Sequence, residues 1–199
     1  MIHIVDSPSS NAKAVYYAYK DLGVACRIVT NLAQLTGAKK IVIPGVGAFG
    51  ALSQFLNDSN FVNPLRELAD EGTKFLGICL GMQILGVSSD ESSGARGLRL
   101  LEVSSNRFPE DELRVPHTGW DQVSICASHQ LLEGLNHEFS AYFSHSYCVP
   151  VDHKLTLAIT NYGIAFTSII AKGNIVGVQF HPERSQDSGR KILSNFADW

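Results

Sequence analysis

The stretch Gly77-Ile78-Cys79-Leu80-Gly81 places a cysteine between two glycines, each separated from it by one apolar residue. The apolar pair Phe75-Leu76 precedes this stretch, and Met82-Gln83-Ile84-Leu85 after it is typical of the start of a helix. A strand that turns sharply into a helix needs glycines beside the turn residue, because a larger side chain would clash there. The sequence therefore predicts an elbow that projects Cys79 from the carboxyl edge of a sheet.

Cys79 at this bend has the surroundings of a reactive thiol. The helix that follows it offers free backbone N–H groups and a dipole that favour the thiolate. A buried structural cysteine is the alternative, but such a residue does not require flanking glycines. Near the other end of the chain, Gln179-Phe180-His181-Pro182-Glu183 follows an apolar run. His181 there can serve as a base that Glu183 orients, which completes a cysteine, histidine and acid pattern. A solvated carboxylate at a helix start is the alternative for Glu183.

Stretches spread over most of the chain resemble a known family. They are, in order, Pro44-Gly45-Val46-Gly47, residues 77–83, His145-Ser146-Tyr147 and His181-Pro182-Glu183. With them the chain resembles the class I glutamine amidotransferases, which use a Cys-His-Glu triad. The resemblance implies an α/β fold of the flavodoxin-like kind, with an open, mostly parallel twisted sheet and helices on both faces. It also implies hydrolysis of glutamine to glutamate and ammonia.

The resemblance assigns roles to residues around the triad of Cys79, His181 and Glu183. The Leu80 N–H of the elbow is one donor of an oxyanion hole, and the Val46 N–H is the second, in an activated state. The residues expected to bind glutamine are Gly47, Gln83, Glu91, Ser146 and Tyr147. Simpler alternatives are a loop carboxylate for Glu91 and ordinary strand alternation for Ser146 and Tyr147. His3, His129, His137 and His153 have no expected catalytic role.

The loop that contains Val46 also matches a different motif. Residues 45–50 spell G-x-G-x-x-G, the glycine pattern of dinucleotide-binding loops. However, a proline opens the loop, and it is not the first strand–helix unit. Asp70, the acid that follows, lies in a helical stretch rather than at the end of a strand. We therefore favour the oxyanion loop, and we expect no cofactor.

Residues 116–120, Pro-His-Thr-Gly-Trp, are predicted to form a rigid, partly aromatic loop, for which the simpler alternatives are a core position for Trp120 and an ordinary surface position for His117. This loop resembles that of the family member in histidine biosynthesis, a glutaminase subunit that forms a heterodimer with a (β/α)8 cyclase and passes ammonia to it. The resemblance implies the same partner here, with contacts at Asn11, His117, Trp120 and Arg184. Asp121 replaces the family's usual asparagine, and Ser7-Pro8 replaces its usual tyrosine and glycine. Both changes lie at expected contact loops.

Composition and charge exclude several classes of protein. The chain has 199 residues and a formal net charge of −3 without a basic run, which disfavours binding to nucleic acid. Its length suits a single domain over residues 1–199. No stretch has the length and apolarity of a membrane span, and the four cysteines have no zinc-binding spacing. We expect a cytoplasmic protein with reduced thiols and no metal.

Apolar periodicity predicts the order of the elements. Strands are expected at 2–5, 24–29, 40–43 and 75–78, and helices at 11–22, 51–56 and 62–69. This alternation predicts a parallel sheet. After a polar loop at 88–94, short strands are expected at 98–103, 122–126, 141–149, 155–160, 165–171 and 174–180. Tight turns at 161–163 and 172–174 indicate an antiparallel section, and a helix over 185–196 follows.

Other functions stay open from the sequence alone. One is the glutaminase subunit of a different synthase, and another is an interaction module that kept the fold without its chemistry. A third is a cysteine hydrolase that acts without a partner. Thiol labelling and co-purification of a synthase distinguish these possibilities.

Overall fold

The structure of the protein, a computed structural model, describes residues 1–111, 113–152 and 154–199, so that His153 lies outside the described residues. The elements that alternate in the first part are β1 (Ile2–Val5), α1 (Ala12–Asp21), β2 (Cys26–Val29), η1 (Leu32–Leu35), β3 (Lys40–Gly45), α2 (Phe49–Asp58), α3 (Val62–Asp70), β4 (Lys74–Cys79) and α4 (Leu80–Ile84). The elements that follow are β5 (Ser88–Ser89), β6 (Ser104–Arg107), β7 (His117–Ile125), η2 (Gln130–Leu132), β8 (Glu138–His145), β9 (Tyr147–Cys148), β10 (Thr156–Tyr162), β11 (Ile164–Lys172), β12 (Ile175–Val178), η3 (Pro182–Arg184) and α5 (Gln186–Asp198).

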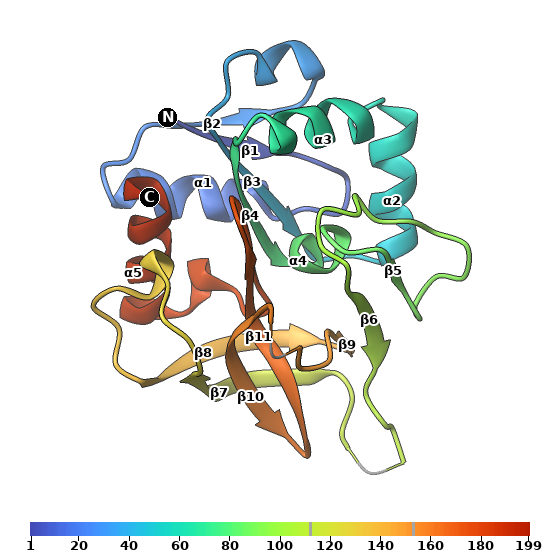
Figure 1. The fold of residues 1–199 in the computed structure, drawn as a ribbon, viewed down its shortest axis with the longest axis vertical. Helices are drawn as coiled ribbons and strands as arrows, with labels where there is room; N and C mark the ends of the chain where they lie inside the picture. The colour runs from blue at the N-terminus through green and yellow to red at the C-terminus, as the bar shows by residue number, and fades with distance from the viewer. Residues whose placement is uncertain (112, 153) are drawn as a thin grey trace.

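Among the described residues, nine strands form one sheet in the order β2-β1-β3-β4-β12-β11-β10-β7-β8. The first five strands of this order are parallel to one another, which gives the flavodoxin-like order 2-1-3-4-5 when β12 is counted as the fifth. From β12 to β8 the neighbours are antiparallel. The predicted parallel sheet with an antiparallel section in the second half is confirmed (Figure 1).

Helices cover both faces of the parallel strands, as predicted. Ile4, Val42 and Leu76 point to one face and pack in the same core cluster as α1 and α5. Their neighbours along the strands, Ile41 and Phe75, point to the other face and pack with α2 and α3. Figure 1 shows the two pairs of helices on opposite sides of the strands. The alternation of side chains along a strand thus gives the sheet two buried faces, which explains its continuously apolar strands.

The predicted strand at 98–103 is wrong. The Leu98 N–H donates to the Ile84 carbonyl at 2.7 Å, and the Leu101 N–H donates to the Leu85 carbonyl at 3.0 Å. The segment therefore satisfies the free carbonyl groups at the end of α4, while Leu98 and Leu101 fill the core beside α2 and α3. The apolar residues of this segment are thus explained by their packing in the core and not by membership of a sheet.

The polar segment 88–94 is more ordered than the predicted loop. Ser88 and Ser89 pair with Ser104 and Ser105 in a short parallel ladder between β5 and β6. Residues 117–120 also differ from the prediction, since they begin strand β7, in which His117 pairs with His145. The strand predicted at 141–149 is divided at Ser146 into β8 and β9, which belong to different sheets. The other predicted strands and helices are present, most of them with shifted ends, and the turns at 161–163 and 172–174 join antiparallel neighbours. Within the described ranges, no helix is both long and apolar enough to cross a membrane.

Candidate active site

The predicted elbow is present at the carboxyl end of β4. Cys79 has φ +55° and ψ −112°, a backbone conformation that L-residues rarely adopt. A Cβ atom at Gly81 would lie 1.7 Å from the Ile43 carbonyl oxygen, and one at Gly77 would lie 2.5 Å from the Gly81 carbonyl oxygen. Glycine is therefore required at both positions, because backbone from β3, β4 and α4 meets there without room for a side chain.

His181 and Glu183 reach the elbow because β12 lies beside β4. The two strands are parallel, with Gly177 opposite Gly77 and Val178 opposite Ile78, so the chain leaves β12 next to Cys79. His181 Nδ1 lies 2.8 Å from Glu183 Oε1, and these side chains are only 4% and 1% exposed. Asn11 also donates to Glu183 Oε1. The carboxylate holds the imidazole ring in place and leaves Nε2 for Cys79, as a triad requires.

The surroundings of His181 favour its protonated form. Burial by itself lowers the pKa of this imidazole, but charge and hydrogen-bonding interactions with Cys79, together with those with Glu183, raise the pKa to about 10. A pKa this high keeps the imidazole of His181 protonated at neutral pH. The pair can thus supply both a nucleophile and a proton.

One pocket of about 500 Å³ collects the triad and most of the other predicted site residues. Its lining includes Cys79, His181 and Glu183 of the triad, Val46 and Leu80 of the expected oxyanion hole, Gly47, Gln83, Glu91, Ser146 and Tyr147 of the expected glutamine site, and Asn11 and Arg184 of the expected partner contacts. His117 and Trp120 are not part of this lining. Residues from six separate segments thus converge at the carboxyl edge of the parallel strands, where α/β sheets bind ligands.

The two expected oxyanion donors differ in their state. Leu80 is the first residue of α4, so no carbonyl of its own helix claims its N–H. The Val46 N–H donates to the Ser9 carbonyl at 2.9 Å, although the Val46 side chain is 54% exposed. In this conformation the Val46 peptide must rotate before it can serve an oxyanion. The segment with Ser7-Pro8, where the sequence departs from the family pattern, thus holds the loop at Ser9.

Gln83 and Glu91 line the pocket, and each also makes hydrogen bonds within the protein. Gln83 Nε2 donates to the Tyr147 carbonyl at 3.0 Å and to Gln179 Oε1 at 3.1 Å. Glu91 Oε2 accepts from the Phe49 N–H at 2.6 Å and so caps the start of α2. The capping contact occupies one carboxylate oxygen of Glu91 and leaves the other for a ligand.

His117 does not present a surface to a partner, which corrects the expected contact at this residue. Its side chain is buried and stacks on Phe143 and Tyr162. His117 Nδ1 lies 3.1 Å from His145 Nε2, and His117 Nε2 lies 3.2 Å from Asp121 Oδ2. Asp121, where the family has asparagine, thus pairs with a buried imidazole. Sequence spacing could not distinguish an interface from an interior here, because both faces of this strand carry aromatic residues.

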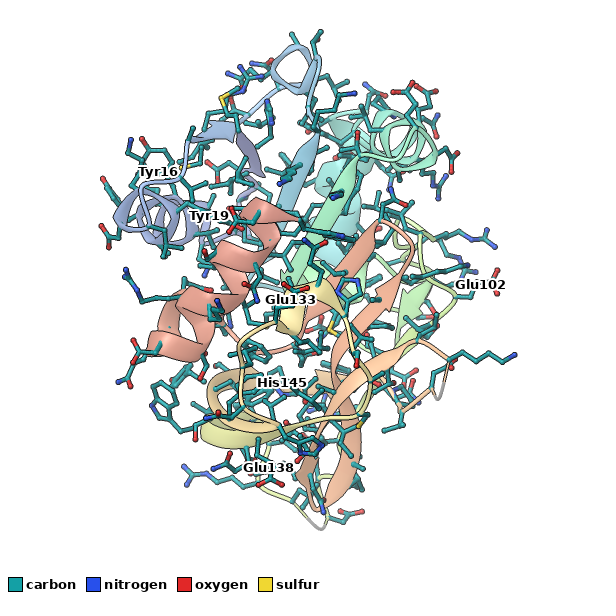
Figure 2. The ribbon with its side chains drawn as sticks, turned by 60° about the vertical axis from the view of Figure 1, so that its left-hand side comes forward. Tyr16, Tyr19, Glu102, Glu133, Glu138 and His145 are labelled. Atoms are coloured by element: carbon teal, nitrogen blue, oxygen red, sulfur yellow. The ribbon has the colours of Figure 1, made fainter. Side chains whose placement is uncertain are left out.

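His145, labelled in Figure 2, lies at the end of β8 and contacts the pocket. Its Nδ1 lies 2.8 Å from the Tyr147 carbonyl oxygen, which can only accept a hydrogen bond. Burial, with smaller effects of His117 and His181, lowers the pKa of His145 to about 3, although the Tyr147 contact opposes this. His145 is therefore neutral, and its proton is on Nδ1.

Two expected contact residues remain on the surface near the pocket. The Trp120 side chain is 49% exposed and meets Tyr142 edge to face. The Arg184 guanidinium lies 4.0 Å from the centre of the Tyr142 ring. Trp120 and Arg184 thus flank one aromatic side chain on the same face of the molecule.

Gln179 was not assigned a role from the sequence. It is completely buried, and its Nε2 lies 3.6 Å from Cys79 Sγ. A polar residue at the end of an apolar strand, two positions before His181 and therefore on the same side of an extended chain, was the available signal. In the described part of the chain, no cluster of three or more His, Cys, Asp or Glu side chains could hold a metal.

Comparison with known proteins agrees with this geometry. The family model "Glutamine amidotransferase class-I" matches residues 3–199. The protein named imidazole glycerol phosphate synthase subunit HisH of Buchnera aphidicola is 38% identical, over 99% of this chain and 98% of that protein. Its namesake in Methanosarcina acetivorans is 39% identical over the same shares of each chain.

Solved structures share the fold at lower identity. A crystal structure described as a glutamine amidotransferase superposes with a TM-score of 0.79 at 19% identity, covering 100% of both chains. The structure of PurLQS from Thermotoga maritima gives 0.76 at 16% identity, covering 99% of this chain and 97% of that one. At these identities the likeness establishes the fold.

Proposed function

The chain belongs to the class I glutamine amidotransferases, and we propose that it is the glutaminase subunit of an imidazole glycerol phosphate synthase in histidine biosynthesis. It hydrolyses glutamine to glutamate and ammonia with Cys79, His181 and Glu183. It then passes the ammonia to a (β/α)8 cyclase that makes imidazole glycerol phosphate and an aminoimidazole carboxamide ribonucleotide. The observation that carries the proposal is the meeting of the Cys79 elbow with the buried His181–Glu183 pair in one pocket.

The first half of the reaction forms a thioester. The Cys79 thiolate attacks the side-chain amide carbon of glutamine and forms the C–S bond, and the carbonyl electron pair moves to oxygen. The Leu80 N–H and, after its peptide rotates, the Val46 N–H stabilise this oxyanion. When the tetrahedral intermediate collapses, the C–N bond breaks and His181 gives its proton to the leaving nitrogen, which departs as ammonia.

The second half of the reaction restores the enzyme. Neutral His181 takes a proton from a water molecule, whose oxygen attacks the thioester carbon. The C–S bond breaks, its electron pair returns to Cys79, and glutamate is released. Glu183 stabilises the imidazolium of His181 and keeps its ring aligned in both halves. Gln83, Glu91, Gly47, Ser146 and Tyr147 hold the glutamine that enters the pocket.

The reaction needs a partner because ammonia released into neutral water is mostly ammonium, which is not a nucleophile. We place the cyclase over the face that carries the pocket mouth, where Val46, Tyr17 and Trp120 are 54%, 64% and 49% exposed. Arg184 is near all three, since it lines the pocket with Val46, lines a neighbouring hollow with Tyr17, and covers Tyr142 beside Trp120. We propose a cytoplasmic location, because the reducing conditions there keep a catalytic thiol in its reduced form.

The experiment is to purify the chain with a (β/α)8 cyclase and to compare Cys79→Ala with Cys126→Ala, a change at an exposed free cysteine. We expect Cys79→Ala to abolish glutamine-dependent synthesis and to leave ammonia-dependent synthesis intact, because only the first requires the thiolate. Cys126→Ala should retain both activities. Loss of ammonia-dependent synthesis in Cys79→Ala would overturn the division of labour, and co-purification with a different synthase would overturn the choice of partner.

A second measurement tests the chemistry without the cyclase. A glutamine analogue with an electrophile in place of the amide should modify Cys79, and the modification should be lost in His181→Ala. A chain that keeps only the fold as an interaction module would leave Cys79 unmodified.

A further inference from the structure

We propose that Gln179 is a catalytic residue whose side-chain amide donates a hydrogen bond to the ionised sulfur of Cys79. It stabilises that thiolate in the free enzyme and as the leaving group when the thioester is hydrolysed. The second role rests on the proposed function, and the first does not depend on it.

The contact is built into the core rather than onto the surface. Gln179 is 0% exposed, and its Nε2 lies 3.6 Å from Cys79 Sγ. A buried side-chain amide must find partners for its polar atoms, since leaving one unpaired costs about 1–3 kcal/mol. Among the described residues, the Gln179 side chain makes one further hydrogen bond, in which its oxygen accepts from Gln83 Nε2 at 3.1 Å.

The direction of the amide follows from a single backbone carbonyl. The Tyr147 oxygen only accepts hydrogen bonds, so the Gln83 atom 3.0 Å from it is the NH₂ group. The second hydrogen of that NH₂ group points to Gln179, which must therefore present its own oxygen to Gln83. The NH₂ group of Gln179 is then the one that faces the sulfur. His145 donates to the same carbonyl at 2.8 Å and helps to hold it.

The partners of the sulfur change with its charge. The Ser144 carbonyl, 3.8 Å from Sγ, can accept from a protonated thiol. The Gln179 amide can only donate to the sulfur in this arrangement, and donation to an anion is about twice as strong as donation to a neutral group. The Gln179 amide does not titrate. The groups of the pocket that do, besides Cys79, are His145, His181, Glu183, Glu91, Tyr147 and Arg184. Its contribution therefore depends on the charge of the sulfur alone.

Because the Gln179 amide favours the ionised sulfur, it acts in those steps of the reaction in which the sulfur carries a negative charge. Once the C–S bond forms, the sulfur is neutral and the amide hydrogen bond weakens. When the thioester breaks down, the electron pair returns to sulfur and the bond is regained, with no proton transferred. Loss of the amide donor should therefore slow thioester hydrolysis and make thiolate formation require a higher pH.

The test compares Gln179→Met, which keeps the length of the side chain without its N–H, with Gln54→Met on the exposed face of α2. Alkylation of Cys79 by iodoacetamide is followed against pH by peptide mass spectrometry, which separates Cys79 from the other thiols. We expect the alkylation profile of Gln179→Met to shift to higher pH and its rate at neutral pH to fall roughly tenfold, as for a lost hydrogen bond to a charged group. Gln54→Met should match the wild type.

An unshifted alkylation profile in folded Gln179→Met would overturn the inference. If that variant does not fold, side-chain amide NMR of the wild-type protein decides, because the Gln179 NH₂ resonances must move when Cys79 is alkylated, and unmoved resonances would contradict the contact. Alkylation requires no glutamine turnover. A shifted profile in a chain that fails to hydrolyse glutamine with any cyclase would therefore refute the proposed function and not the thiolate contact.

Discussion

At the scale of single residues, the conformation of Cys79 carries a cost. A non-glycine residue held in a sparsely populated region costs about 1–3 kcal/mol, which the surrounding structure must outweigh. At Cys79 the φ of +55° aims the sulfur away from the sheet edge and into the pocket. The strained bend and the reactive position are thus the same feature.

This cost predicts a difference between two inactive variants. Cys79→Gly and Cys79→Ala both remove the sulfur, but only glycine relieves the strain at this bend. The greater backbone entropy of unfolded glycine offsets about 0.5–1 kcal/mol of this relief. We therefore expect Cys79→Gly to be more stable than Cys79→Ala by about 1 kcal/mol. Urea unfolding of both variants measures the difference, and a glycine variant less stable than the alanine variant by about 0.5–1 kcal/mol, the entropy cost of glycine alone, would show that the bend is unstrained.

A second prediction at this scale concerns the two residues that act through His181. His181→Ala removes the proton donor and should lower glutamine turnover by roughly 10²–10⁴-fold. Glu183→Gln keeps the side-chain shape while it removes the charge that helps to raise the pKa of His181. We expect a smaller loss of turnover for Glu183→Gln, with its pH profile displaced to lower pH. Steady-state kinetics against pH separate the two, and an equal loss would mean that Glu183 does more than orient and stabilise the ring.

At the scale of elements, β7 and β8 are joined by a buried pair of histidines. His145 has a pKa of about 3, against an ordinary value of 6.5. Because the unfolded chain takes up a proton that the folded chain refuses, stability falls as pH drops from 6.5 towards 3, by about 1.4 kcal/mol per pH unit. His181, with its raised pKa, acts in the opposite direction and loses its contribution as pH rises from 6.5 to about 10.

His145→Asn should therefore make the protein less sensitive to acid. The asparagine amide can still donate to the Tyr147 carbonyl, but it does not titrate. We expect the slope of unfolding free energy against pH, between pH 6.5 and the onset of acid unfolding, to be shallower than in the wild type. His137→Asn, at an exposed histidine, should keep the wild-type slope. Chemical unfolding at several pH values gives these slopes, whatever the absolute stability of each variant.

Glu91 caps the start of helix α2, and a substitution can test whether it also binds glutamine. Glu91→Gln keeps an oxygen that can accept from the Phe49 N–H but removes the negative charge. If Glu91 binds the amino group of glutamine, KM should rise at least tenfold while the melting temperature changes little. A KM that does not change would leave Glu91 as a helix cap only. Glu91→Ala, which loses the cap, should lower stability by about 1 kcal/mol in either case.

At the scale of the whole molecule, one sheet joins two apolar layers. Phe196 on α5 and Leu65 on α3 are both fully buried, on opposite faces of the parallel strands. Because every central strand contributes side chains to both layers, we expect the predicted single domain to unfold as one unit. Phe196→Ala should cost about 3–5 kcal/mol and Leu65→Ala about 2–5 kcal/mol. Circular dichroism and tryptophan fluorescence should report one shared transition for each variant, and two separate transitions would contradict a single domain.

Much of the site was predictable because its parts are encoded locally. Gly77, Cys79 and Gly81 describe the elbow within five residues, and the clash that requires glycine at position 77 is with its near neighbour Gly81. His181 and Glu183 are two residues apart, so one turn can pair them. Alternating strand and helix patterns likewise predicted the parallel sheet, because each strand carries its own apolar residues.

The tertiary structure alone decided the contacts between distant segments. Whether His117 faces a partner or the core depends on strand β8 and on Tyr162, which lie far along the chain. The same holds for the strand expected at 98–103, whose leucines fill the core beside α2 and α3 and whose N–H groups bind the end of α4. Local sequence therefore determined which groups are chemically able to react. Only the pairing of β12 with β4, a contact that no local pattern encodes, decided that cysteine, imidazole and the Gln179 amide meet, because sheet order is set by the free energy of the whole folded core.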